Sequence, residues 1–193
     1  MPSDTRLIFD FGEQRDENAG QHDVGQYDAE QYDAEQYDTW QSIDDVVMGG
    51  VSTSEFHIKH DGVAIFEGSV SLEQGGGFAS VSSPPTALDL DGFSGLEVRV
   101  RGDGQRYRLR LRTDVGADTV AYQAVLTTQD GTWQTEKLPF DAFKARYHGQ
   151  PVPEAPPLDA SSITSFGLLI ADGQAGPFRL EVDWIRAYAE EGC

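Results

Sequence analysis

The sequence predicts an all-β fold, a two-layer antiparallel β-sandwich of the jelly-roll type. Apolar and polar side chains alternate along several short segments, as they do in antiparallel strands that bury one face. Turns containing glycine or proline separate these segments, and no long helical pattern is present. A chain of 193 residues has the size of one domain with a substantial core. We therefore predict a single domain over residues 1–193.

The strand pattern is clearest where charged and apolar residues alternate. Tyr107, Leu109 and Leu111 are interleaved with arginines and should face the core, and Phe178 to Trp184 alternate in the same way. A short helix is expected over 141–146, after Pro139. The predicted strands are residues 6–11, 63–72, 78–82, 95–101, 105–113, 119–127, 132–138, 163–171 and 178–188.

A polar, acidic segment interrupts the domain at about residues 12–38. It contains a tandem repeat of Gln-Tyr-Asp-Ala-Glu starting at Gln26. A five-residue period matches neither a helix nor a strand, and the segment has almost no aliphatic side chains to bury. We expect a flexible insertion, whose tyrosines could also contact a partner.

The charge of the chain excludes one class of partner. The net charge is −19, from 33 acidic and 14 basic residues, so a nucleic acid backbone would be repelled. Lysine is scarce, and an acidic, lysine-poor surface suits solubility in high salt, where self-repulsion is screened. We therefore expect a protein from a salt-loving organism, with a stability that depends on salt.

Cellular location and cysteine chemistry are constrained only weakly. No apolar run is long enough to span a bilayer, which predicts no direct membrane insertion. The first residues lack the pattern of a secretory signal, so a cytoplasmic location is expected. Cys193 is the single cysteine and cannot form an intramolecular disulfide.

A glycine-rich segment with adjacent acids is the first candidate binding site. Paired glycines allow positive φ angles and close backbone approach, and adjacent carboxylates could bind a cation or accept sugar hydroxyls. The structural alternative is that an aspartate ties down the turn through backbone amides while Met48 fills the core. A rigid loop that also presents a surface to a partner combines the two. The candidates are Asp44, Asp45, Met48, Gly49, Gly50, Ser52 and, after a later glycine turn, Phe78.

A stripe of arginines is the second candidate. Alternation places Arg106, Arg108, Arg110 and Arg112 on one face, with Arg99 and Arg101 expected on a neighbouring strand of that face. One interpretation is a cross-strand ion-pair network, because clustered like charges are unfavourable unless compensated. Its acidic members would be Glu67, Glu97, Glu181 and Asp183. The other interpretation is a face that receives an anionic group or an acidic partner segment. Its candidates are Arg101, Arg108, Arg110, Tyr122 and Gln123.

Catalysis has little support in the sequence. The four histidines are scattered, and no serine lies in a nucleophile elbow. We therefore predict a non-catalytic domain without a cofactor. Asp10 and Asp183 would be the candidates for a structural calcium ion, because carboxylate oxygens suit calcium, although salt pairing explains both residues equally well.

Several motifs together resemble the complex I intermediate-associated protein 30 family, over nearly the whole chain. They are WxxxDDVVMGGVS (40–52), FxG (66–68), GGFAS (76–80), GDG (102–104), YRLRLRT (107–113), Trp133 ahead of LPF (138–140), APPL (155–158), SFGLLI (165–170), GPF (176–178) and DWI (183–185). The resemblance implies a galactose-binding-like jelly roll. It also implies a non-enzymatic factor that assists assembly of a respiratory or other membrane-associated complex by binding protein. A carbohydrate-binding module, with sugar on a concave sheet face, is the alternative.

The chain departs from that family pattern in two places. The polar insertion before Trp40 is longer than the family needs, and Ser82 stands where the family usually has an arginine. If that arginine contacts a ligand in relatives, the contact is missing here.

Overall fold

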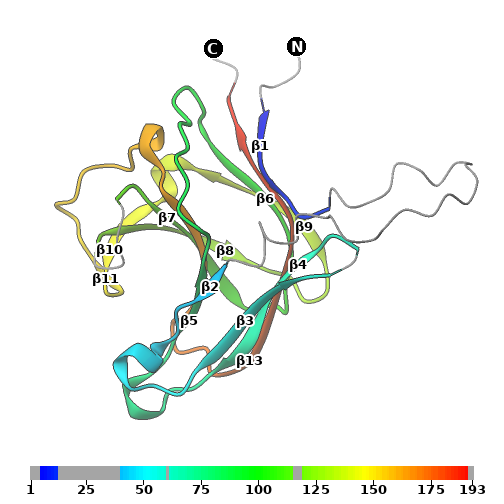
Figure 1. Cartoon of the computed structure of the whole chain (residues 1–193), viewed down its shortest axis with the longest axis vertical. Helices are drawn as coiled ribbons and strands as arrows, with labels where there is room; N and C mark the ends of the chain where they lie inside the picture. Colours follow the sequence, from blue (N-terminus) through cyan, green and yellow to red (C-terminus); the bar gives the residue numbers. More distant parts are fainter. Residues whose placement is uncertain (1–4, 13–39, 60, 115–118, 191–193) are drawn as a thin grey trace, which may run out of the picture.

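Two antiparallel sheets stack face to face around one core, which confirms the predicted two-layer sandwich (Figure 1). The computed structural model describes residues 5–12, 40–59, 61–114 and 119–190. Apart from Gly12, the predicted insertion at about 12–38 lies outside the described residues, as does Cys193.

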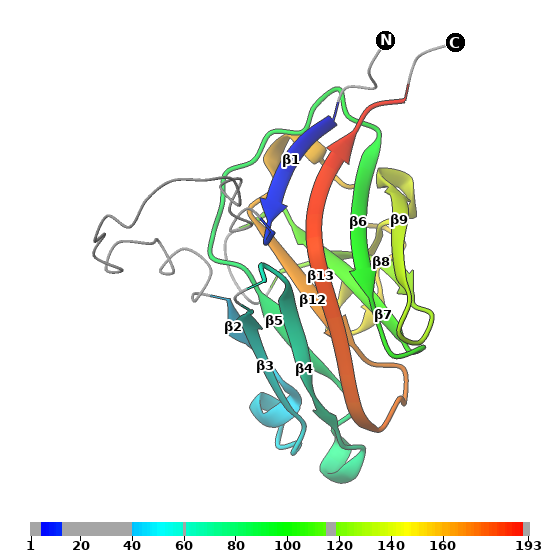
Figure 2. The same cartoon turned by 90° about the vertical axis from the view of Figure 1, so that its right-hand side faces the viewer.

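Sheet A, in the foreground of Figure 2, is built around a long C-terminal strand. Its spatial order is β3 (Thr53–Ile58), β4 (Ala64–Val70), β13 (Gly176–Tyr188), β6 (Gly95–Arg101) and β9 (Trp133–Pro139). The first strand, β1 (Thr5–Asp10), also pairs with β13, beyond the end of β4. The first and last described strands therefore lie side by side.

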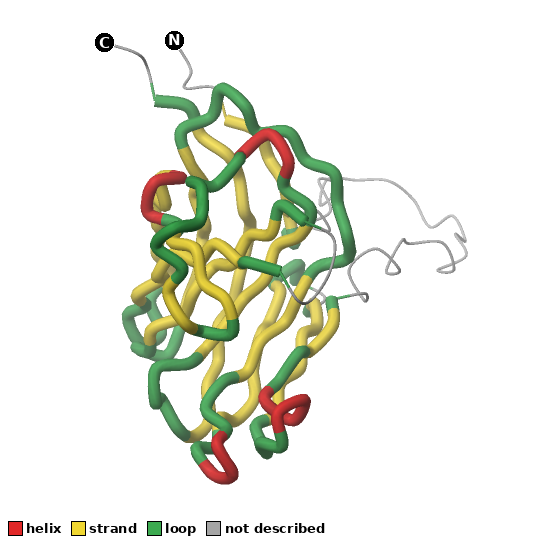
Figure 3. The backbone as a smooth tube through the Cα atoms, turned by 90° about the vertical axis from the view of Figure 1, so that its left-hand side faces the viewer, coloured by secondary structure: helices red, strands yellow, loops and turns green. Residues whose placement is uncertain are grey.

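Sheet B forms the second layer, on the opposite side of the molecule (Figure 3). Its spatial order is β11 (Gln150–Pro151), β10 (Lys144–Tyr147), β8 (Ala121–Thr127), β7 (Arg106–Arg112), β12 (Ser165–Ile170), β5 (Ala79–Ser82) and β2 (Gln41–Ser42). Every strand pair in both sheets is antiparallel.

The core lies between the sheets and is filled by the residues that the alternation selected. Tyr107, Leu109 and Leu111 of β7 are fully buried, as are Val98 and Val100 of β6. Burying large apolar side chains from both layers contributes roughly 1.5–3 kcal/mol each, which makes this core the main source of stability.

An irregularity in β13 overturns one predicted side-chain direction. The pairing of β13 with β6 shifts register between Val182 and Trp184, so that one extra residue bends the strand. Ile185 and Ala187 are therefore buried, whereas Trp184 is only half-buried and lies against the guanidinium of Arg186. The prediction that Trp184 continues the inward row is wrong.

The described helices are single turns of 3₁₀ type. They are η2 (Asp45–Met48), η3 (Glu73–Gly75), η4 (Phe140–Ala142) and η5 (Ala160–Ser162). The helix expected over 141–146 is wrong, because Lys144, Ala145 and Arg146 pair with β8 as the strand β10. No helix in the described ranges has the length and apolar character needed to cross a membrane.

Candidate functional site

Two loops meet at the end of the sandwich that lies away from the chain termini (Figures 1 and 2). The first loop contains η2 and joins β2 to β3, and the second contains η3 and joins β4 to β5. Ser52 Oγ accepts a hydrogen bond from Ser71 N at 2.9 Å, which links the loops directly. The two loops therefore form one structural unit.

Asp45 is the centre of this unit. Its side chain is almost completely buried, and its Oδ1 accepts a hydrogen bond from Ser52 N at 2.9 Å. Its Oδ2 accepts from Ser52 Oγ at 2.5 Å, Gly77 N at 2.7 Å and Phe78 N at 3.3 Å. Burial alone would raise the pKa of this carboxyl, but the hydrogen bonds outweigh burial and hold it below its usual value.

Glycines make room for this buried carboxylate. A Cβ on Gly50 would lie 2.3 Å from Asp45 Oδ1, and a Cβ on Gly76 would lie 2.6 Å from Asp45 Oδ2. Gly49 ends η2 with a φ of 90°, a left-handed conformation that favours glycine. Gly50 and Gly76 are therefore required by packing around Asp45, which the sequence did not reveal for Gly76.

Asp44 anchors the start of the same loop. Its carboxylate accepts hydrogen bonds from Ser54 N at 2.8 Å, Ser54 Oγ at 2.6 Å and Ser80 N at 3.1 Å. Both acids are thus engaged by protein donors, which favours the structural interpretation of this acidic pair. The amides they bind belong to neighbouring strands and loops and not only to their own turn.

The anchored loops hold a group of apolar side chains in water. We call this group the apolar tip; its members are Val46, Val47, Met48, Val51 and Leu72. Val47 is 75% exposed and Met48 is 63% exposed. The expectation that Met48 fills the core is therefore wrong, and the other four residues were not among the predicted binding residues. Consecutive apolar residues inside an acidic, glycine-rich loop were the available signal.

The arginine stripe is divided between the two sheets. Arg99 and Arg101 lie on β6 in sheet A, whereas Arg106 to Arg112 lie on β7 in sheet B. The connection through Gly102 and Gly104 crosses from one layer to the other instead of forming a hairpin. The expectation that both groups share one face is wrong.

The predicted ion-pair network lies on sheet A, whose strands carry all four of its predicted acidic members. Arg101 donates to the buried carboxylate of Glu181, which also accepts from Arg179, and Arg179 pairs with Glu67. Arg99 Nε is 3.0 Å from Asp183 Oδ2. Burial would raise the pKa of Glu181, but the bonds from Arg101 and Arg179 lower it. Arg101 also lies over the ring of Trp133, at 4.9 Å from its centroid, so the guanidinium of this predicted binding residue is already engaged.

The remaining predicted binding residues lie on β7 and β8. Arg108 donates to Asp172 at 2.6 Å and 2.8 Å and to Gln123 Oε1 at 3.1 Å. Gln123 pairs directly with Arg110, so the two residues share the outer face of sheet B. Tyr122 is buried in the core, and its hydroxyl donates to Pro156 O at 3.0 Å. Tyr122 therefore does not contribute to that outer face.

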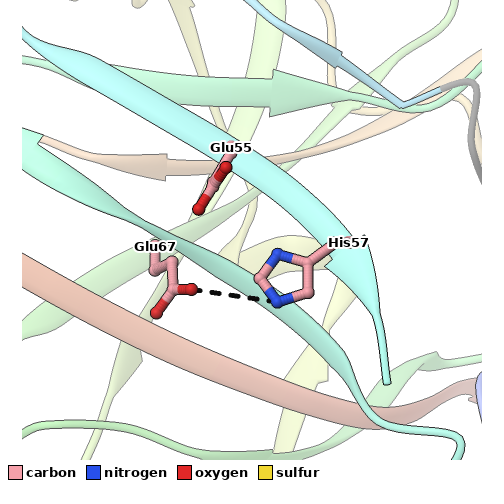
Figure 4. A group of neighbouring side chains, drawn as sticks. All are labelled: Glu55, His57 and Glu67. Carbon is pink, nitrogen blue, oxygen red and sulfur yellow. Dashed lines mark ion pairs between the residues drawn. The ribbon is translucent and has the colours of Figure 1, made fainter. Parts of the chain in front are cut away.

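Three side chains on sheet A have the arrangement of metal ligands (Figure 4). Glu55 and His57 alternate on β3, and Glu67 lies directly opposite Glu55 on β4. One possible ligand atom from each lies within 4.8 Å of the others. Arg179 already pairs with Glu67, however, so a metal ion would have to compete with that guanidinium. Glu67 Oε1 also lies 3.8 Å from His57 Nε2, so two of the three side chains already interact with each other.

The two proposed calcium ligands approach one another at Gly12. A Cβ on Gly12 would lie 3.1 Å from Asp183 Oδ1 and 3.3 Å from Asp10 Oδ1. Asp10 Oδ1 accepts a bond from Gly12 N at 2.8 Å, and Asp183 pairs with Arg99. Two carboxylates beside a strand end suit calcium in their oxygen chemistry, and calcium binding here stays a prediction.

Two open depressions lie beside the first residues of β13 and the turn that follows β6. They share Asp103 and Arg179 in their linings. Asp103 accepts hydrogen bonds from Tyr107 Oη at 2.9 Å and from Arg179 N at 2.9 Å, and the Arg179 side chain pairs with Glu67. The two charged residues that both depressions share are thus engaged in structural contacts.

Comparison with curated proteins identifies relatives over most of the chain. The chain is 28% identical over 168 residues to "Complex I intermediate-associated protein 30, mitochondrial" of Drosophila melanogaster, covering 76% of this chain and 57% of that protein. It is 29% identical over 171 residues to the protein of the same name of Mus musculus, covering 78% and 52%. The chain thus spans about half the length of these relatives.

The fold also resembles solved structures. A family 11 carbohydrate-binding module of the cellulase Lic26A-Cel5E of Clostridium thermocellum matches with a TM-score of 0.58 at 18% identity, over 80% of this chain and 89% of that module. This likeness supports the jelly-roll fold alone. The model of the family described as "Complex I intermediate-associated protein 30 (CIA30)" matches residues 28–182. The chain therefore belongs to the complex I intermediate-associated protein 30 family.

Proposed function

We propose that this domain is a non-catalytic binding module that assists the assembly of a protein complex, a respiratory complex or a related membrane-associated one. The names of its curated relatives support an assembly role, and those relatives are about twice as long as the matched region. The apolar tip is the surface that we assign to partner binding.

One observation carries this proposal: five apolar side chains are exposed on loops that hydrogen bonds to two aspartates hold in place. Asp45 and Asp44 fix these loops to the amides of residues 52, 54, 77, 78 and 80. An exposed apolar group is unfavourable in water unless a partner covers it. A rigid loop loses little conformational entropy on binding, so that more of the contact energy appears as affinity.

The carbohydrate alternative has little exposed aromatic surface among the described residues, where Tyr147 on β10 is the one exposed aromatic side chain of either sheet. Sugar grooves present exposed aromatic side chains, yet Tyr107, Tyr122 and Phe166 of β7, β8 and β12 are all buried in the core. Trp133 and Trp184 on sheet A are half-buried and covered by the guanidinium groups of Arg101 and Arg186. The geometry therefore favours a protein partner over a sugar.

Affinity capture from the native organism, followed by mass spectrometry, tests the proposal. The chain should recover a reproducible set of subunits or assembly factors of one complex. The double variant Val47→Asp/Met48→Asp should lose that set, because two charges on the apolar tip oppose burial against a partner.

Leu7→Asp is the matched control, since Leu7 is also exposed but lies on β1, near the other end of the sandwich. This variant should recover the same partners as the wild type. Failure of the wild type to capture any reproducible partner would count against the proposed function. Equal loss of partner capture in both variants would count against the assigned surface.

A further inference from the structure

The two sheets differ sharply in charge. Every strand of sheet A contains at least one aspartate or glutamate. The strands of sheet B contain none, although the chain has 33 acidic residues. Instead, sheet B carries six basic residues at outward positions. They are Arg106, Arg108, Arg110, Arg112, Lys144 and Arg146. The strands on one face of a very acidic protein therefore carry only basic charges, and we call this face the basic face.

Arg110 lies at the centre of this basic face. One row of directly paired residues crosses the sheet through Lys144, Gln123, Arg110, Gly167, Ser82 and Gln41. A Cβ on Gly167 would lie 3.1 Å from Arg110 Nε and 3.3 Å from its Nη2. The guanidinium therefore lies flat against the sheet, in space that only glycine leaves free.

Arg110 also differs from its neighbours in its partners. Arg108 pairs with Asp172, and Arg112 donates to Thr119 at 3.0 Å and 2.9 Å. Arg110 Nη2 is buried and has no hydrogen-bond partner in the described part of the chain. Burial, together with the nearby charge of Arg112, lowers the pKa of Arg110 to about 10, so it remains protonated at neutral pH. A buried cation without a counterion is unfavourable in the free protein, and a bound anion would relieve that cost.

The spacing of the arginines indicates the shape of the ligand. Arg108, Arg110 and Arg112 recur at every second residue of a strand, about 7 Å apart. An extended peptide repeats the side chains of one face at the same interval, and guanidinium groups bind carboxylates in a bidentate manner.

We propose that the outer face of sheet B binds an extended acidic peptide segment of a protein partner, with one of its carboxylates paired to Arg110. This inference rests on the proposed function, which supplies a protein as partner, and it adds a second contact surface to the apolar tip. A short segment with a few charges suits a chain of net charge −19 better than a polyanion, because long-range repulsion grows with ligand charge.

Fluorescence anisotropy with defined probes tests the inference on the full chain. The probe is an eight-residue peptide in which glutamate alternates with threonine, and its counterpart has glutamine in place of glutamate. The wild type should bind the acidic probe and not its counterpart, and the affinity should fall as salt is added. Arg110→Gln should weaken binding about tenfold or more, the effect of losing one charge-assisted pair.

Two further variants make the test specific. Gln123→Glu places a carboxylate beside Arg108 and Arg110, where it should pair with the arginines and abolish binding of the acidic probe. The same pairing should raise the melting temperature, which would show that the loss of binding is not caused by unfolding. Lys137→Gln removes one positive charge from sheet A, where Lys137 is 61% exposed, and should leave the affinity within about twofold.

Equal binding of both probes, or unchanged binding by Arg110→Gln and Gln123→Glu, would overturn the inference. Tighter binding of an oligogalacturonate or an oligothymidylate of equal charge would overturn the assignment to a peptide. The acidic probes could fail to bind while partner capture still depends on the apolar tip. That outcome would refute peptide binding by sheet B and would leave the proposed function supported.

Discussion

Gly77 donates its backbone N–H to Asp45 Oδ2 over 2.7 Å, although 32 residues separate the two in the chain. This bond joins the loop that carries η2 to the loop that carries η3 and fixes the apolar tip. Asp45 thus acts as an internal anchor, with a buried carboxylate that accepts hydrogen bonds from Ser52, Gly77 and Phe78.

Replacing Asp45 should destabilise the protein strongly. Asp45→Asn puts an amide NH₂ where at least one donor now points and removes the charge from several hydrogen bonds. We expect a loss of about 2–4 kcal/mol in the free energy of unfolding, measured by urea denaturation. Asp61→Asn, at an exposed position, should change it by less than about 0.5 kcal/mol. A small effect at Asp45 would refute the anchoring role.

A methyl group on Gly50 should disturb the same anchor. The Cβ of Gly50→Ala would overlap Asp45 Oδ1 and Cγ, at 2.3 Å and 2.4 Å. We expect a loss of about 2–3 kcal/mol. The adjacent Gly49→Ala meets no atom within 4 Å and should lose only about 1 kcal/mol, from its left-handed conformation. Thermal unfolding of both variants shows which one loses more stability. A larger loss of stability for Gly49→Ala than for Gly50→Ala would contradict the prediction.

Glu181 should make stability depend on pH in the acid range. Its pKa is lower in the folded state than in the unfolded chain, so its contribution is present above the unfolded value of about 4.5 and is lost as the pH falls through the folded value. Glu181→Gln should cost about 1–3 kcal/mol at pH 7, because Arg101 loses its carboxylate partner.

The difference between Glu181→Gln and the wild type should shrink as the pH is lowered from 6 to 3. Urea denaturation at each pH provides the measurement. Parallel stability curves for the two proteins over that range would show that Glu181 does not titrate with unfolding.

Salt should stabilise the chain. With 33 acidic and 14 basic residues, the folded state repels itself, and concentrated KCl screens that repulsion. We expect the melting temperature to rise by several degrees between about 0.1 M and 2 M KCl. An unchanged or lower melting temperature would contradict the predicted adaptation to salt.

Side-chain alternation predicted the sandwich and much of its core. Tyr107, Leu109 and Leu111 point inward as expected, since period-two burial is a local property of a strand with one covered face. The same reasoning failed at Trp184, because a one-residue register shift after Val182 is not visible in a two-residue pattern.

The candidate site was predicted only in part. The acidic, glycine-rich segment was singled out as a candidate binding site, and this stays a prediction; its structural alternative agrees with the hydrogen bonds that Asp44 and Asp45 accept. Met48 was predicted to be buried, but it is exposed. Burial of a loop residue depends on what packs over it, and nothing covers Met48 among the described residues.

By itself, the sequence determined that this chain forms short antiparallel strands with one buried face, and that it is strongly acidic. Only the tertiary structure decided that Arg101 joins the carboxylates of sheet A, while Arg110 lies on the outer face of sheet B with its Nη2 buried and without a hydrogen-bond partner among the described residues. Alternation reports whether a side chain points into a core or away from it. It does not report which of two stacked sheets a strand joins, because that choice depends on pairing between segments far apart in the chain.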